Sequence, residues 1–177
     1  AVDAMLQQLG DPRLTHVPGL EGVRTDLLKK AVGIYQEILD DHGEDESVNL
    51  RKASALSRLT DVLLLLGEGE RAQVKAERAV ELWRDCLAQR DTDYRRTGLV
   101  QALFQLSERE LVRQRLELAG RLQVEAAQHL DVVRARTDGD SPRLERRLAS
   151  AQGSAARHAG RTDPGLAVDL LQSACER

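Results

Sequence analysis

The chain has 177 residues, of which 41% are hydrophobic and 31% are charged, and its formal net charge is −3. These values argue against disorder and disfavour a general nucleic-acid binder, which needs a positive surface to neutralise phosphates. Aromatic residues make up only 2% of the chain, and a core of Leu, Ala and Val favours helices packed on helices over a β-sandwich or barrel. The sequence therefore predicts an all-α fold.

Residues 1–47 are predicted to form an N-terminal helical extension. Residues 1–9 have the pattern of a short amphipathic helix, with Val2, Met5, Leu6 and Leu9 on one side. Breaks at 10–12 and 16–19 separate it from a long helix expected from about 20 to 41. The apolar stripe of the long helix comprises Val23, Leu27, Leu28, Ala31, Ile34, Tyr35, Ile38 and Leu39. Ser47 is the expected N-cap of the next helix.

Residues 48–90 carry the most informative pattern of the chain. Two apolar stripes flank one glycine, in the order Leu56, Leu59, Leu63, Gly67, Ala72, Ala76, Ala79. Spacings of three and four residues place each stripe on one helix face, with Gly67 at the corner of a hairpin. The predicted helices run from about 48 to 66 and from about 70 to 89. This order resembles the tetratricopeptide repeat (TPR) consensus, which implies hairpins that stack into a binding surface.

Residues 91–137 and 138–177 are predicted to form two further, degenerate hairpins of one TPR-like domain. In the first of them, one long helix is expected to end at Gly120, with a break near Ser107 as the alternative. The apolar residues of that helix are Leu99, Leu103, Leu106, Val112, Leu116 and Ala119, and its return helix, Leu122–Ala135, carries Ala126, Leu130 and Val133. In the last hairpin, a helix starts at Pro142, and a final helix carries Ala167, Leu171 and Ala174.

The sequence contains none of the common catalytic or nucleotide-binding motifs, such as a Walker A loop, HExxH or GxSxG. Cys86 and Cys175 are expected to be buried free thiols, because no Cys and His cluster surrounds them. The longest apolar run, 62–66, is far shorter than the roughly 20 residues of a membrane span. We therefore expect no catalytic residue, no metal site, no cofactor and no membrane span.

A second resemblance lies at the N-terminus. The motif is made of the stretches Ala1–Leu6, Gly10–Leu14, His16–Leu20, Leu27–Ala31 and Tyr35–Leu39. It is similar to the region that follows the kinase domain in large bacterial serine/threonine protein kinases with C-terminal TPR arrays, over about residues 1–90. The resemblance implies that the chain is an excised part of an ATP-dependent kinase, often membrane-anchored. No kinase catalytic residue maps onto this sequence, so none is assigned.

In a TPR array, the first helix of each hairpin lines the groove that holds a peptide or a partner helix. The consensus positions predict three sets of groove residues: Ser54, Ser57, Arg58, Asp61 and Leu65; Glu110, Gln114 and Glu117; Arg147, Ser150, Ser154 and Arg157. The carboxylate clamp of the family is not reproduced, since Ser57 and Asp61 replace the basic and amide groups that it needs. We expect an unidentified protein or peptide partner. The alternatives are self-association of the chain, binding of a small molecule in a pocket between hairpins, and plain solvated helix surface.

Overall fold

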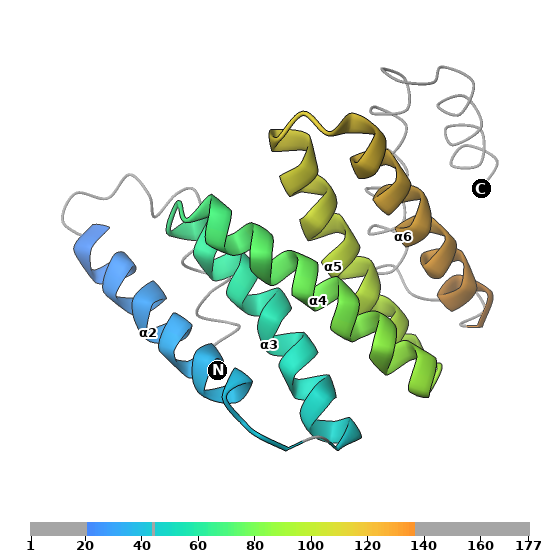
Figure 1. Cartoon of the computed structure of the whole chain (residues 1–177), viewed down its shortest axis with the longest axis horizontal. Coiled ribbons are helices and arrows are strands. Elements are labelled where there is room, and N and C mark those ends of the chain that lie inside the picture. The colour runs from blue at the N-terminus through green and yellow to red at the C-terminus, as the bar shows by residue number, and fades with distance from the viewer. Residues whose placement is uncertain (1–20, 44, 137–177) are drawn as a thin grey trace. The chain divides into compact units, whose positions relative to one another are not determined.

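The computed structural model describes residues 21–43 and 45–136, and these residues form five α-helices without a β-strand (Figure 1). The helices are α2 (Glu21–Leu39), α3 (Glu46–Leu65), α4 (Gly69–Gln89), α5 (Asp93–Val112) and α6 (Leu116–Arg136). The predicted all-α class is confirmed for this part of the chain. The helices predicted within 1–9 and 138–177 lie outside the described residues.

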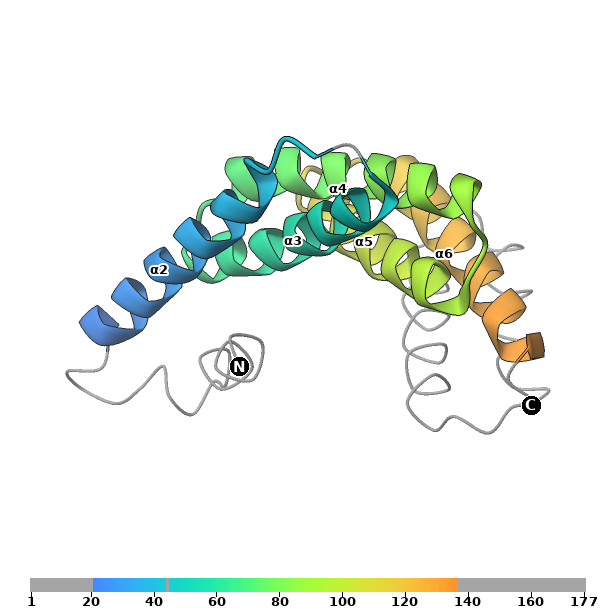
Figure 2. The ribbon, with the colours of Figure 1, turned by 90° about the horizontal axis from the view of Figure 1, so that it is seen from below.

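The chain divides into two compact units, Ala1–Ala79 and Val80–Arg177, so the boundary falls inside α4. In the first unit α2 packs on α3, and in the second α5 packs on α6. Figures 1 and 2 show the members of each pair side by side from two directions. Each unit therefore has its own helical core, and α4 contributes one half of its length to each.

The core of the first unit joins all three of its helices. Its buried residues are Leu28, Ala31 and Tyr35 from α2, Ala55, Leu59, Val62 and Leu63 from α3, and Ala72 from α4. The three alanines predicted on the second arm of the hairpin are fully buried. Small side chains at these positions allow close approach of helix backbones, and each fully buried leucine contributes about 2 kcal/mol from apolar burial.

The helices of the second unit follow the spacing of the first hairpin. Both ends of α5 lie 47 residues after the ends of α3 (93 − 46 and 112 − 65), and both ends of α6 lie 47 residues after those of α4 (116 − 69 and 136 − 89). This constant offset defines equivalent positions in the two hairpins. The hairpins are longer than the 34 residues of a regular TPR.

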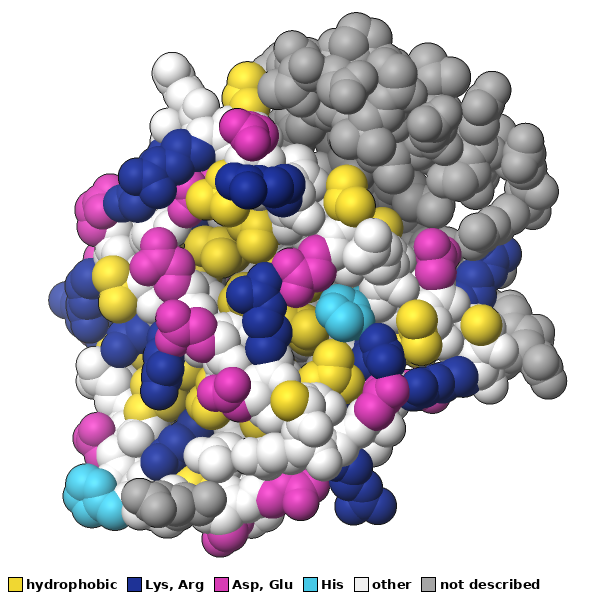
Figure 3. All heavy atoms as spheres, turned by 45° about the vertical axis from the view of Figure 1, so that its right-hand side comes forward, with side chains coloured by type: hydrophobic (Ala, Val, Ile, Leu, Met, Phe, Trp, Pro, Cys, Tyr) yellow, Lys and Arg dark blue, Asp and Glu magenta, His cyan; other side chains and the backbone are white. Residues whose placement is uncertain are grey.

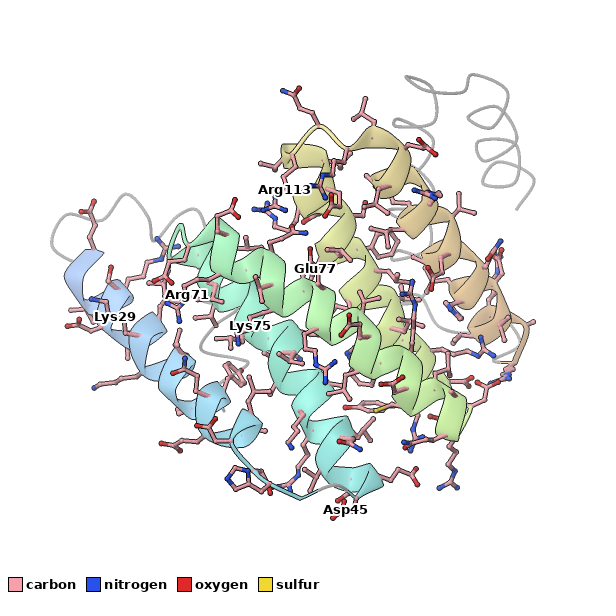
Figure 4. The ribbon with its side chains drawn as sticks, viewed as in Figure 1. Lys29, Asp45, Arg71, Lys75, Glu77 and Arg113 are labelled. Atoms are coloured by element: carbon pink, nitrogen blue, oxygen red, sulfur yellow. The ribbon has the colours of Figure 1, made fainter. Side chains whose placement is uncertain are left out.

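The N-caps of α3 and α5 obey the same offset. Asp45 and Thr92 lie in extended backbone, and their side chains accept hydrogen bonds from the backbone N–H groups of Val48 and Arg95, at 2.9 and 3.4 Å. Asp45 lies at the start of α3 in Figure 4. The prediction of Ser47 as the cap is wrong: Ser47 lies inside α3 and donates its hydroxyl to Asp45. That hydrogen bond, followed by the one from Val48, lowers the pKa of the Asp45 carboxyl.

The turns of the two hairpins also coincide, at Gly67 and Gln114, with φ values of 78° and 61°. In each turn the N–H groups of two successive residues bond back into the helix: Gly67 and Glu68 to Leu64 and Leu63, Gln114 and Arg115 to Leu111 and Glu110. This pattern is a Schellman motif, in which a residue with positive φ ends the helix. Gly67 is therefore confirmed as the corner of the first hairpin.

The prediction of one long helix up to Gly120 is wrong, as is the alternative break near Ser107. Residues 113–115 form the turn, Ser107 lies within α5, and Gly120 lies within α6. Glutamine in the left-handed region gives no sequence signal, because glycine is the residue that usually takes this conformation. The apolar periodicity continues across the turn and hides it.

Exchanging the residues at the two turns should change stability in opposite directions. We expect Gly67→Gln to lower the free energy of unfolding by about 1 kcal/mol and Gln114→Gly to raise it by about 1 kcal/mol, because only glycine adopts positive φ without a steric penalty. Urea denaturation measures both changes. The matched control is Gln128→Gly, the same substitution at an exposed position inside α6, which should destabilise by about 1 kcal/mol. Stabilisation by both glycines would contradict the role of φ.

The second unit is built around Trp83 of α4. The ring of Trp83 is buried and meets Tyr94 edge to face, with 6.0 Å between the ring centroids. The guanidinium of Arg95 is also buried and donates to the backbone carbonyls of Cys86 and Arg90, at 2.6 and 3.3 Å. Arg95 thereby binds carbonyls at the C-terminal end of α4. Cys86 is buried and is not disulfide-bonded, as predicted.

Candidate functional site

The predicted groove positions of the first hairpin lie along one side of α3. Ser54, Arg58, Asp61 and Leu65 are half-buried. Ser57 is buried, and its hydroxyl donates to the carbonyl of Ala53 at 3.4 Å. Ser57 therefore serves the helix itself, and the side chains that a partner could reach on α3 are the other four.

In the second hairpin, the structure corrects the register of the predicted groove. The offset of 47 residues places the equivalents of the α3 positions at Gln101, Phe104, Gln105, Glu108 and Val112. Glu110 is instead the equivalent of the core residue Leu63 and is buried. Gln114 lies in the turn, and Glu117 lies in α6 rather than α5. The predicted set in this hairpin is therefore wrong. The third set, Arg147, Ser150, Ser154 and Arg157, lies outside the described residues.

Four of the corrected positions, without the buried Gln105, join Tyr94 at the start of the helix in a surface that we call the α5 outer face: Tyr94, Gln101, Phe104, Glu108 and Val112. These residues recur at intervals of three, four and seven, so they share one side of the helix. Val112 and Tyr94 are 70% and 60% exposed, which makes them two of the most exposed large hydrophobic side chains among the described residues. Phe104 is half-buried between them and Glu108 is exposed. The face combines apolar contact area with one carboxylate.

A charged network fixes the ends of α5 and α6. Asp91 receives paired hydrogen bonds from Arg96, both at 2.7 Å, and from Arg136, at 2.7 and 3.1 Å. Arg136 also donates to Asp93 at 3.2 Å. The bonds from Arg136 and then Arg96 hold the pKa of Asp91 well below its usual range, and Asp91 in turn raises the pKa of Arg136. Bidentate geometry and shared partners make this network more than a set of isolated surface pairs.

A second bidentate pair joins α4 to α6, where Arg84 donates to Glu125 at 3.0 and 2.6 Å. His129 lies next to both groups of charges. The Arg96 guanidinium, which has no acceptor, donates to Nδ1 of His129 at 2.9 Å, so this nitrogen carries no proton. Burial lowers the pKa of His129, and the charge of Arg96 lowers it further. These residues position helices; no reactive group is held among them.

The low pKa of His129 predicts a pH dependence of stability. In the unfolded chain the histidine has a pKa near 6.5. Just below that pH, His129 is protonated in the unfolded state but still neutral in the folded state, because its pKa is lower there. The free energy of unfolding should therefore fall as the pH drops from about 7 toward the pKa of folded His129. Asp91 and Asp45 add a further loss only below about pH 4, where unfolded carboxylates protonate. Urea denaturation between pH 5 and 7.5 measures the effect. His129→Gln should flatten that slope, and an unchanged slope would contradict the assignment.

The described residues offer no metal site, since no group of three or more His, Cys, Asp or Glu side chains in 21–43 and 45–136 could hold an ion. No helix in this part of the chain is long and apolar enough to cross a membrane. Figure 3 shows Lys and Arg side chains interspersed with Asp and Glu, and scattered hydrophobic side chains between them. The viewed face is therefore mixed in sign.

Comparison with known proteins returns neither a matching protein-family model nor a matching curated protein.

Proposed function

We propose that this chain is a TPR-like, non-catalytic interaction module that holds a protein or peptide partner along the α5 outer face. The observation that carries the proposal is the α5 outer face, where the exposed Tyr94 and Val112 flank the half-buried Phe104. Exposed aromatic and aliphatic side chains on one helix face are the contacts that a partner helix or peptide uses.

The hairpin construction supports the TPR-like part of the proposal. In both hairpins the second helix carries fully buried small residues, Ala72, Ala76 and Ala79 in one and Ala119 and Ala126 in the other. The constant 47-residue offset is typical of a modular helical array. The N-terminal motif supports a wider context, in which the module regulates or docks partners for a bacterial serine/threonine kinase.

A capture experiment tests the proposal with two variants that carry the same substitution. The bait is the 177-residue chain, and the lysate is that of the source organism. Val112→Glu places a charge on the α5 outer face, whereas Val74→Glu places it on α4 at a residue of similar exposure, 59%. We expect Val112→Glu to lose the partners that the unmodified chain captures and Val74→Glu to retain them. Circular dichroism should show unchanged helix content in both, because both valines face water.

Identical partner sets for the two variants would contradict the assignment of the α5 outer face. Sedimentation equilibrium distinguishes the alternative of self-association. A monomer at all concentrations removes self-association, whereas a dimer weakened by Val112→Glu alone identifies the partner as a second copy of the chain.

A further inference from the structure

The α5 outer face carries a charge as well as apolar side chains. Glu108 is the charged residue of this face and is exposed. Phe104 lies four residues before it and Val112 four residues after it, so the carboxylate lies between two apolar side chains on the same side of the helix. Arg109, the next residue along the chain, is turned about 100° away around the helix axis. A partner that covers Phe104 and Val112 therefore also covers this carboxylate.

Glu108 differs from several carboxylates of the second unit that lie in ion pairs with arginines. The paired carboxylates are those of Asp91, Asp93, Glu110 and Glu125. In the part of the chain that the structure describes, the side chain of Glu108 forms neither an ion pair nor a hydrogen bond. No cation among these residues therefore competes for the Glu108 carboxylate, and a cation of a partner can pair with it.

The first hairpin has the same combination at equivalent positions. The offset of 47 residues relates Asp61 of α3 to Glu108, and Leu65 to Val112. In both hairpins an acidic residue is thus followed, about one helical turn later, by an aliphatic residue on the same side of the helix. The recurrence indicates that the pair of acidic and aliphatic side chains belongs to the repeat rather than to one helix.

Tyr94 provides a fixed aromatic contact at the other end of the α5 outer face. It is 60% exposed, yet its ring meets the buried ring of Trp83 edge to face. Because this contact orients the Tyr94 ring, a partner that covers it causes little further loss of conformational entropy. From Tyr94 to Val112 the face extends over 18 residues (112 − 94), or about 27 Å. Its intervals of three, four and seven residues suit packing against another helix.

We infer that the partner of the α5 outer face is an amphipathic helix with a Lys or Arg opposite Glu108 and apolar side chains against Phe104 and Val112. This inference rests on the proposed function and adds the chemistry of the partner. The apolar contacts on both sides of Glu108 exclude water, which strengthens an ion pair formed between them. An acidic or phosphorylated segment is disfavoured, because its negative charge would repel the Glu108 carboxylate.

Peptide display on the 177-residue chain tests the inference. The probe is a library of random peptides of 20 residues, the length of α5. We expect the enriched peptides to carry apolar residues at intervals of three and four, with Lys or Arg at one fixed position among them. Selection on the Glu108→Lys chain should instead enrich Asp or Glu at that position. The matched control is Glu37→Lys, the same substitution at an exposed residue of α2, which should enrich the same peptides as the unmodified chain.

Affinity measurements on the most enriched peptide complete the test. Fluorescence anisotropy should show binding weakened by about threefold to fivefold in Glu108→Gln, the effect of one exposed ion pair, and by about tenfold or more in Glu108→Lys. Replacing the Lys or Arg of the peptide by Glu should restore binding to the Glu108→Lys chain. Circular dichroism should show unchanged helix content in both variants, because Glu108 is exposed.

The outcomes distinguish this inference from the proposed function. If no peptide is enriched, or if the enriched peptides still bind Val112→Glu, the proposed function itself fails. Peptides that depend on Val112 but carry no Lys or Arg at a fixed position would overturn this inference alone, as would equal affinity for Glu108→Lys and the unmodified chain. A dimer of the chain that Glu108→Lys dissociates would also overturn it and would assign the face to a second copy.

Discussion

Replacement of Gly98 by alanine is expected to destabilise the second unit by about 1–2 kcal/mol, although alanine is the better helix former. Gly98 lies in α5, and a Cβ atom there would meet three ring atoms of Trp83 at 2.5, 2.5 and 2.6 Å. Trp83 is buried, so its ring cannot rotate away without disturbing the core. Overpacking of a core costs about 1–3 kcal/mol and exceeds the gain of about 1 kcal/mol from helix propensity.

Urea denaturation followed by circular dichroism measures this loss, and Gly120→Ala is its control. Gly120 also lies inside a helix of the second unit, but no atom lies within 4 Å of its missing Cβ. We expect Gly120→Ala to stabilise the chain by about 0.5–1 kcal/mol. In a Trp83→Leu background the cost of Gly98→Ala should shrink, because the clashing ring atoms are gone. A stabilising Gly98→Ala in the unmodified chain would show that Trp83 does not pack against α5 in this way.

The helices that the sequence predicts correctly are those that carry a strong local signal. The apolar spacing and Gly67 locate α3 and α4 to within two residues at each end, because a glycine with positive φ and two regular stripes act together. The sequence does not predict the break between α5 and α6, because Gln114 adopts the positive φ of Gly67 without being a glycine. The requirement for glycine at position 98 also has no local sequence signal, because it arises from contact with the ring of Trp83, fifteen residues earlier in the chain.

The sequence predicts the candidate site correctly only where it also predicts which residues of a helix occupy the consensus positions of the repeat. On α3 the predicted positions follow from Gly67 and lie together on one side of the helix, apart from the burial of Ser57. On α5 the missing turn signal shifted the predicted positions toward the C-terminus, onto the core residue Glu110 and the turn residue Gln114. Once the 47-residue offset is known, the same sequence yields Phe104, Glu108 and Val112 directly. The offset depends on tertiary structure, so periodicity within single helices could not supply it.

Leu63 and Glu110 show how the two hairpins differ at one equivalent core position. Leu63 is fully buried among apolar side chains of α2 and α3, whereas Glu110 is buried within an ion pair, with its carboxylate 3.5 Å from the guanidinium of Arg115. Arg115 itself is exposed. At the position equivalent to Arg115 the first hairpin carries Glu68, so it has a second carboxylate where the second hairpin has a cation at the edge of its turn.

The second large effect is expected from Leu63→Glu, which should destabilise the first unit by about 4 kcal/mol or more at pH 7, because a buried carboxylate without a cation is strongly disfavoured. The loss of stability should diminish at lower pH, where the introduced glutamate is neutral, and the control Leu63→Met should cost less than about 1.5 kcal/mol.

Glu110→Leu, in contrast, should be neutral or stabilise the chain by about 1–2 kcal/mol, since the exposed Arg115 returns to water and an apolar side chain fills the site. Urea denaturation at pH 5 and 7 measures all three. A large loss from Glu110→Leu, reproduced by Arg115→Ala, would instead show that the ion pair holds the glycine-free turn at Gln114 together.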